Sequence, residues 1–127
     1  MNLLLDTHII LWLASDIDKL SAKAKSAIAD ENNIRYVSIV SAWEVAIKLG
    51  AQKLRFDGGL PEFYRLIDHN DFYETGITRD YLNLLGYLGG FHKDPFDRLI
   101  IATALAENFT IVTADENIQK YKVKWLW

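Results

Sequence analysis

Leu3-Leu4-Leu5-Asp6 decides the fold, because this apolar β-type run ends in a carboxylate and passes at once into a helical pattern. Residues 36–44, 94–97 and 111–115 repeat the arrangement of a carboxylate at the start of a helix, in two cases directly after a strand-like run. If the strands are parallel neighbours, their carboxyl ends lie along one edge of the sheet. We therefore expect acids that are distant in sequence to meet in one pocket, which favours metal cations.

Strand-like and helical patterns alternate along the chain. Strands are predicted at Asn2–Leu5, Ile34–Ser38, 72–75, 110–113 and 123–125. Helices are predicted at about 8–14, 21–30, 43–49, 60–70, 78–88, 95–107 and 115–121. Such alternation predicts right-handed crossovers, and hence an α/β fold of three layers in which helices flank a mainly parallel central sheet.

Two of the predicted helix starts have a specific local signal. Ser41 and Glu44 have the spacing of a capping box, which predicts that a helix covers residues 43–49 and stops at the following glycine. Pro95 follows Asp94, and proline at the first helical position costs no hydrogen bond. Both signals bring an acid to a helix start.

The composition is that of a folded domain. The 127 residues are 50% hydrophobic and 24% charged, and we predict a single domain over 1–127. The absence of cysteine excludes disulfides, zinc-thiolate sites and thiol nucleophiles. No basic leader is present and no apolar run approaches the ~20 residues that span a bilayer, so we expect a cytoplasmic protein with no membrane partner.

The net charge of −3 argues against a broad basic surface for nucleic acid. It does not exclude a nuclease, because divalent ions bound in an acidic pocket invert the field of that pocket.

Each acid taken alone has an ordinary explanation as a helix-capping group. Asp6 and Asp115 suit the cap position, Glu44 suits the capping box, and Asp97 suits the first turn, each with about 0.5 to 1 kcal/mol of stabilisation. Capping does not explain why the helix starts at one edge of the sheet all have carboxylates. Ser, Thr or Asn would cap these helices equally well without mutual repulsion. The set therefore indicates a functional site.

Oxygen ligands without histidine or cysteine favour Mg²⁺ or Mn²⁺. The candidate catalytic and metal-binding residues are Asp6, Glu44, Asp97 and Asp115, with Thr113 and Asp94 in support. Asp6 and Asp97 are the first choices for direct ligands, and the other two acids complete the site directly or through water. Thr113 is placed to hydrogen-bond a carboxylate or a bound water, while Asp94 is either a helix cap or a contact of the metal site.

These motifs resemble the PIN-domain ribonucleases. Residues 3–8 resemble the opening motif of that family, 41–45 the second acidic motif, 97–104 the third and 111–115 the fourth. The match follows the order and spacing of the family over the whole chain. Residues 92–98, His-x-Asp-Pro-Phe-Asp-Arg, are similar to a subgroup of the VapC-type toxins of bacterial toxin–antitoxin pairs.

The resemblance implies an endoribonuclease that depends on Mg²⁺ or Mn²⁺ and leaves a 5′-phosphate and a 3′-hydroxyl. It also implies inhibition by a cognate antitoxin protein, and a homodimer. The candidate acids would then hold the metal against an RNA phosphodiester. The usual small residue after the isoleucine of the third motif is Ile101 here, which is a change in packing.

Other functions fit part of the pattern. A receiver-like signalling module also gathers carboxylates around Mg²⁺, but it needs a lysine after its last functional strand, where this chain has Asp115. A phosphatase with Asp6 as nucleophile usually has a second aspartate two residues later, where His8 stands. A degenerate nuclease fold that binds RNA without cutting it would not need all the acids.

Several other residues have two interpretations. Lys48 and Arg98 either form local ion pairs with neighbouring acids or contact RNA phosphates. For Trp12 and Trp43, core packing is favoured over base stacking or an antitoxin contact. His92 is favoured as a hydrogen-bonded bystander, although it precedes the Asp-Pro pair.

Overall fold

A parallel sheet of five strands forms the centre of the molecule. The structure, a computed structural model, describes residues 1–127. The strands are β1 (Asn2–Leu5), β2 (Ile34–Ser38), β3 (Tyr73–Thr75), β4 (Thr110–Val112) and β5 (Trp125–Leu126). Their order is β3-β2-β1-β4-β5, and every neighbouring pair is parallel. The predicted α/β fold is confirmed.

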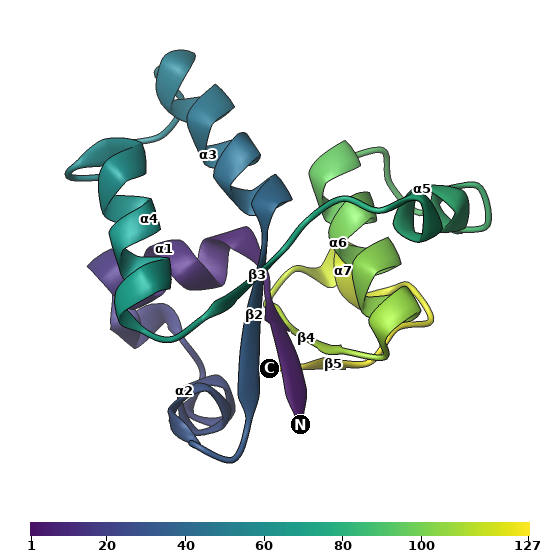
Figure 1. Cartoon of the computed structure of the whole chain (residues 1–127), viewed down its shortest axis with the longest axis horizontal. Coiled ribbons are helices and arrows are strands. Elements are labelled where there is room, and N and C mark those ends of the chain that lie inside the picture. Colours follow the sequence, from purple (N-terminus) through teal and green to yellow (C-terminus); the bar gives the residue numbers. More distant parts are fainter.

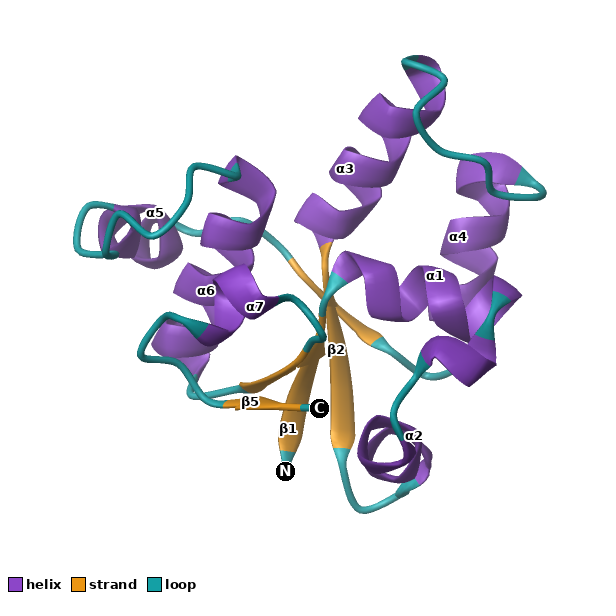
Figure 2. Ribbon diagram, turned by 180° about the vertical axis from the view of Figure 1, so that it is seen from behind, coloured by secondary structure: helices purple, strands orange, loops and turns teal.

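Helices cover both faces of the sheet. They are α1 (Thr7–Ser15), α2 (Ala22–Ala29), α3 (Ile39–Gly50), α4 (Gly59–His69), α5 (Arg79–Leu85), α6 (Pro95–Glu107) and α7 (Glu116–Gln119), with a short 3₁₀ turn at Ile17–Lys19. Figure 1 and the reverse view in Figure 2 show α1 to α4 on one side of the sheet and α5 to α7 on the other. None of the helices is both long and apolar enough to cross a bilayer.

The alternation of side chains along β1 explains the three layers. Leu3 and Leu5 are fully buried in the core formed with α1 to α4. Leu4 is fully buried in the opposite core, with Ile100 of α6 and Ile118 of α7. Burial of each leucine contributes about 1.5 to 3 kcal/mol, so this central strand stabilises both halves of the molecule.

The strand order creates a switch point beside β1. From β1 the chain moves outward to β2 and β3, and it then returns to the other side of β1 to form β4 and β5. Immediately after β1, the backbone N–H of Asp6 donates to the carbonyl of Val112 at 3.1 Å. Ligands of open α/β sheets bind at the carboxyl end of the strands at such a point.

The predicted capping box at the start of α3 is wrong. The helix begins at Ile39, and the hydroxyl of Ser38 caps it by accepting from the N–H of Val40 at 3.1 Å. Ser41 instead lies inside the helix, where its hydroxyl accepts a hydrogen bond from Thr7 of α1 at 2.8 Å. Ser38 stands directly at the end of β2 and is thus the first residue able to cap. The helix ends at Gly50, the glycine that was predicted to terminate it.

Several element ends differ by a few residues from the prediction. The last strand was predicted at 123–125 but covers Trp125–Leu126, because Leu126 is the residue that pairs with Val112 of β4. Predicted helices 78–88 and 115–121 are shorter, at Arg79–Leu85 and Glu116–Gln119.

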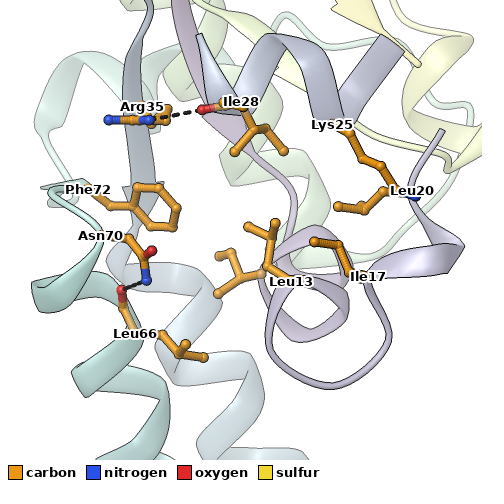
Figure 3. A pocket seen from close by; sticks show the side chains of 11 residues that line it. Leu13, Ile17, Leu20, Lys25, Ile28, Arg35, Leu66, Asn70 and Phe72 are labelled. Carbon is orange, nitrogen blue, oxygen red and sulfur yellow. Dashed lines mark hydrogen bonds between the residues drawn. The ribbon is translucent and has the colours of Figure 1, made fainter. Parts of the chain in front are cut away.

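A mostly apolar pocket of about 450 Å³ opens between α1, α2, α4 and β2. Eight of its 11 lining residues are hydrophobic, and none is acidic. Figure 3 shows Arg35 at one edge, bonded to the carbonyl of Ile28, and Phe72 nearby. The pocket has no oxygen ligands of the kind that the acidic motifs supply, and it is separate from the candidate site.

Candidate active site

Two of the predicted acids lie at the switch point of the sheet. Asp6 follows β1 and Asp115 follows β4, which are hydrogen-bonded neighbours. Both acids line a pocket of about 230 Å³ together with His8, Trp12 and Ala114. The strand order therefore brings together carboxylates that are far apart in the sequence.

Asp6 is held by hydrogen bonds at both of its carboxylate oxygens. Oδ1 accepts from the N–H of Thr7 at 2.7 Å, and Oδ2 accepts from the hydroxyl of Thr113 at 2.9 Å. The side chain is buried, and burial raises the pKa of Asp6 to about 6, although these two hydrogen bonds and His8 oppose the rise. Thr113 also accepts from the N–H of Asp115 at 3.0 Å, so one hydroxyl joins the two acids.

Asp97 lies in the first turn of α6 and is only 8% exposed. Burial is the main cause that raises the pKa of Asp97 to about 8, and the negative charges of Asp6, Asp94, Asp115 and Glu44 raise it further. Carboxylates from separate elements thus act on this one group. That mutual repulsion is the electrostatic signature of a site that a cation would relieve.

Glu44 lies in the second turn of α3 and is 3% exposed. Its Oε2 accepts from Nζ of Lys48 at 2.6 Å, while its Oε1 is buried and has no hydrogen-bond partner. The bond to Glu44 is the largest cause that raises the pKa of Lys48, and Asp94 and Asp97 add to it. The ion-pair interpretation of Lys48 is confirmed, and one acidic oxygen is left free in the site.

The remaining acids cap helices. Asp94 accepts from the N–H groups of Phe96 at 2.9 Å and Asp97 at 3.1 Å, which makes it the N-cap of α6. Asp115 accepts from the N–H of Asn117 at 2.8 Å at the start of α7. Asp115 therefore both caps a helix and lines the acidic pocket, whereas Asp94 caps a helix and its charge raises the pKa of Asp97.

The donor set fits a hard divalent cation. As the side chains lie, no three Asp, Glu or His residues form a ready metal-binding group. The unpartnered Oε1 of Glu44 and the repelled carboxylate of Asp97 are nevertheless oxygen donors without enough positive charge around them. Mg²⁺ and Mn²⁺ bind one or two carboxylates and keep several waters, so they do not require a closed cage of side chains.

Two residues beside Asp97 were not predicted to belong to the site. Nε2 of His92 lies 3.2 Å from Oδ2 of Asp97, and Nδ1 of His92 lies 2.9 Å from the hydroxyl of Tyr121. The position of His92 two residues before Asp94 was the available signal for the histidine. Nothing in the sequence pointed to Tyr121, because 29 residues separate it from His92.

The two tryptophans differ in their surroundings. Trp12 packs against the core of the α1 to α4 side, with its ring 6.0 Å from that of Trp127, as predicted. The prediction of core packing is wrong for Trp43, which is 54% exposed and meets Phe96 edge to face at 5.0 Å. Trp43 directly precedes Glu44 in the sequence, and its ring partner Phe96 directly precedes Asp97.

Solved structures share this fold. A VapBC2 complex from Rickettsia felis bound to a promoter DNA fragment aligns over 99% of this chain and 98% of its own, with a TM-score of 0.72 and 18% identity. VapBC-1 from nontypeable Haemophilus influenzae aligns over 99% and 97%, with a TM-score of 0.70 and 18% identity. At this level of identity the likeness concerns the fold.

A relative in sequence is Ribonuclease VapC22 of Mycobacterium tuberculosis (strain ATCC 25618 / H37Rv), which is 29% identical over 123 residues, or 95% of this chain and 92% of that protein. The family model described as PIN domain matches residues 3–124, which include every acid of the site. By that match, the chain belongs to the PIN-domain family.

Proposed function

We propose that the chain is an endoribonuclease that depends on Mg²⁺ or Mn²⁺ and acts as the toxin of a toxin–antitoxin pair. The observation that carries the proposal is the position of Asp97, buried in the field of four other acids beside the switch point of a PIN-domain sheet. This arrangement destabilises the protein unless a cation balances it. A nuclease that binds divalent cations would explain why these acids lie together.

The proposed ligands are Asp6 and Asp97, with Glu44 and Asp115 completing the site directly or through water. A divalent ion bound there would activate water and offset the charge that develops on an RNA phosphodiester during hydrolysis. The products would be a 5′-phosphate and a 3′-hydroxyl.

The protein's own contribution is to fix the acids. Thr7 and Thr113 hold the carboxylate of Asp6 in one orientation through two hydrogen bonds. Lys48 keeps one oxygen of Glu44 paired while leaving the other free. Because Thr7 starts α1 and Thr113 directly follows β4, the carboxylate of Asp6 is held in place before substrate arrives.

The name of the relative supports RNA as the substrate, and the VapBC complexes among the similar structures support a cognate antitoxin as partner. We further infer, from the family resemblance, a homodimer of a single-domain chain acting in the cytoplasm. Sedimentation of the purified chain tests the dimer, and co-purification with the product of an adjacent small gene tests the antitoxin.

Incubation with labelled RNA tests the enzymatic proposal. We expect cleavage in Mg²⁺ or Mn²⁺, none with a chelator, and a loss of at least about 100-fold for Asp6→Asn and Asp97→Asn, since removal of charged groups from a reacting centre typically costs several kcal/mol. Asp68→Asn, an exposed acid on α4, is the matched control and should cleave normally. Equal cleavage by both site variants would assign the activity to a contaminant.

Neither alternative gains support. Asp115 caps α7 at the position where a receiver-like module needs lysine, and His8 lines the acidic pocket where a phosphatase needs its second aspartate.

A further inference from the structure

We propose that Tyr121 and Arg98 fix His92 in a single tautomer and orientation, so that its Nε2–H group is donated to Asp97 and positions that carboxylate. His92, Tyr121 and Arg98 are then positioning residues that never touch substrate. The hydrogen-bonding arrangement stands by itself, while its consequence for RNA cleavage rests on the proposed function.

The ring of His92 makes two hydrogen-bond contacts, one on each nitrogen. Nδ1 lies 2.9 Å from the hydroxyl of Tyr121, and Nε2 lies 3.2 Å from Oδ2 of Asp97. A neutral imidazole has one donor and one acceptor nitrogen, so the partner on one side determines what the ring offers on the other.

The hydroxyl of Tyr121 determines which nitrogen carries the proton. Nη1 of Arg98 donates to this oxygen at 2.9 Å, and a guanidinium can only donate. The single hydroxyl proton of Tyr121 then goes to Nδ1 of His92 at 2.9 Å in preference to the carbonyl of His92 at 3.4 Å. Nδ1 is thus an acceptor, and the ring proton is on Nε2, facing Asp97.

Arg98 is itself anchored, which makes it a fixed donor. Besides Tyr121, its guanidinium donates to the carbonyls of Gly89 at 2.8 Å, His92 at 3.3 Å and Leu85 at 3.4 Å. These bonds tie the segment between α5 and α6 to the first turn of α6. The guanidinium is thus bonded to carbonyls and to Tyr121, and the ion pair with a neighbouring acid that the sequence suggested for Arg98 is not formed.

Packing limits rotation of the rings. Tyr121 is only 5% exposed, and it meets Phe91 edge to face at 4.9 Å and His92 at 5.4 Å. A histidine ring turned over would lose both of its hydrogen bonds. His92 therefore holds Oδ2 of Asp97, and Oδ1, which accepts no hydrogen bond from the protein, is the oxygen that we assign to a cation.

Partners of metal-ligating groups orient the ligands, and their removal typically costs about 10- to 100-fold in metal affinity or activity. Here the partner of the ligand is a histidine, and the partners of the histidine are a tyrosine and an arginine. The three residues form one chain of donors that ends on Asp97.

Nitrogen NMR of the full chain tests the tautomer. With ¹⁵N-labelled histidine at mildly alkaline pH, where free imidazole is neutral, we expect a pyrrole-type Nε2 and a pyridine-type Nδ1 for His92, assigned by its loss in His92→Ala. In Tyr121→Phe the two tautomers should mix. A protonated Nδ1 in the wild-type protein, in either the neutral or the charged ring, would overturn the proposal.

Calorimetric titration with Mn²⁺ tests the positioning. Tyr121→Phe and His92→Ala should bind Mn²⁺ about 10-fold more weakly, while His92→Gln, whose amide keeps a donor near the place of Nε2, should lose less. In RNA cleavage, kcat should fall and KM should stay the same. Tyr81→Phe is the matched control, because it removes a hydroxyl bonded to Glu107 at the far end of α6.

Wild-type Mn²⁺ affinity in Tyr121→Phe and His92→Ala would overturn the proposal, as would an equal loss in Tyr81→Phe. The tautomer and the Mn²⁺ affinity are measured without RNA. If both behave as expected but no form of the chain cleaves RNA, the proposed function fails while the positioning of Asp97 stands.

Discussion

The hydroxyl of Thr113 donates to Oδ2 of Asp6 across 2.9 Å, although 107 residues separate the two. The contact exists because β1 and β4 are adjacent and parallel, so the residues after Leu5 and Val112 emerge side by side. The same hydroxyl accepts from the N–H of Asp115. A single buried threonine therefore connects two candidate ligands across the switch point.

Thr113→Val should reduce both stability and activity. The change keeps the shape of the side chain but leaves Oδ2 of Asp6 without its donor, which costs about 1 to 3 kcal/mol of unfolding free energy. Urea unfolding measures this cost, and RNA cleavage should fall in parallel. Thr103→Val removes an equally buried hydroxyl, bonded to the carbonyl of Leu99 within α6, and should leave cleavage unchanged.

The metal-free protein should lose stability as the pH rises. The pKa values of Asp6 and Asp97 are raised to about 6 and about 8 in the folded chain, against 3.8 when unfolded, so the native state holds more protons between these values. With respect to these groups, stability is full below about pH 4, and it falls toward pH 8 by several kcal/mol, at about 1.4 kcal/mol for each unit of pKa difference.

Thermal unfolding with a chelator across this range measures the trend. Asp97→Asn should flatten it, because the amide does not titrate. A melting temperature of the wild-type protein that rises steadily from about pH 5 to about pH 8 would contradict the raised pKa values.

Divalent ions should stabilise the protein most at high pH. At about pH 8, saturating Mg²⁺ or Mn²⁺ should raise Tm by roughly 3 to 8 °C, since a ligand that binds only the native state adds to its stability. At about pH 5 the rise should be smaller, because protonated carboxyl groups are poor ligands. A pH-independent rise that persists in Asp97→Asn would place the bound ion elsewhere.

Lys48→Met should destabilise the metal-free protein by about 1 to 2 kcal/mol, because it leaves the carboxylate of Glu44 buried without its cation. The lysine is 38% exposed, so water and salt soften the loss. Added Mn²⁺ should recover part of the stability if it binds Glu44. Lys23→Met, an exposed lysine on α2 without an ion pair, is the control for the general effect of removing a positive charge.

Elements with strong local signals could be predicted from the sequence. β1 and β2 have the predicted bounds, and α6 begins at Pro95 because Asp94 both caps the helix and precedes a proline. The start of α3 was predicted wrongly because two serines compete to cap it. The local spacing favoured Ser41. In the structure Ser38, at the end of β2, caps the helix, while the hydroxyl of Ser41 accepts a hydrogen bond from Thr7.

The meeting of Asp6 and Asp115 in one pocket was predictable in outline, because the parallel strands β1 and β4 end at the same edge of the sheet. The residues that hold the acids in place by hydrogen bonds were not predictable. Tyr121 has no periodic or motif signal, since its role depends on where the segment after α7 crosses α6. The free oxygen of Glu44 likewise depends on the reach of Lys48, which spacing alone does not reveal.

The position of β1 has a consequence for how this molecule can change. The leucines of β1 are buried in the two hydrophobic cores on either side of the sheet, and the residue that follows them is Asp6, which lines the acidic pocket. A substitution that loosens the packing of β1 would therefore disturb the distances between the acids of the pocket.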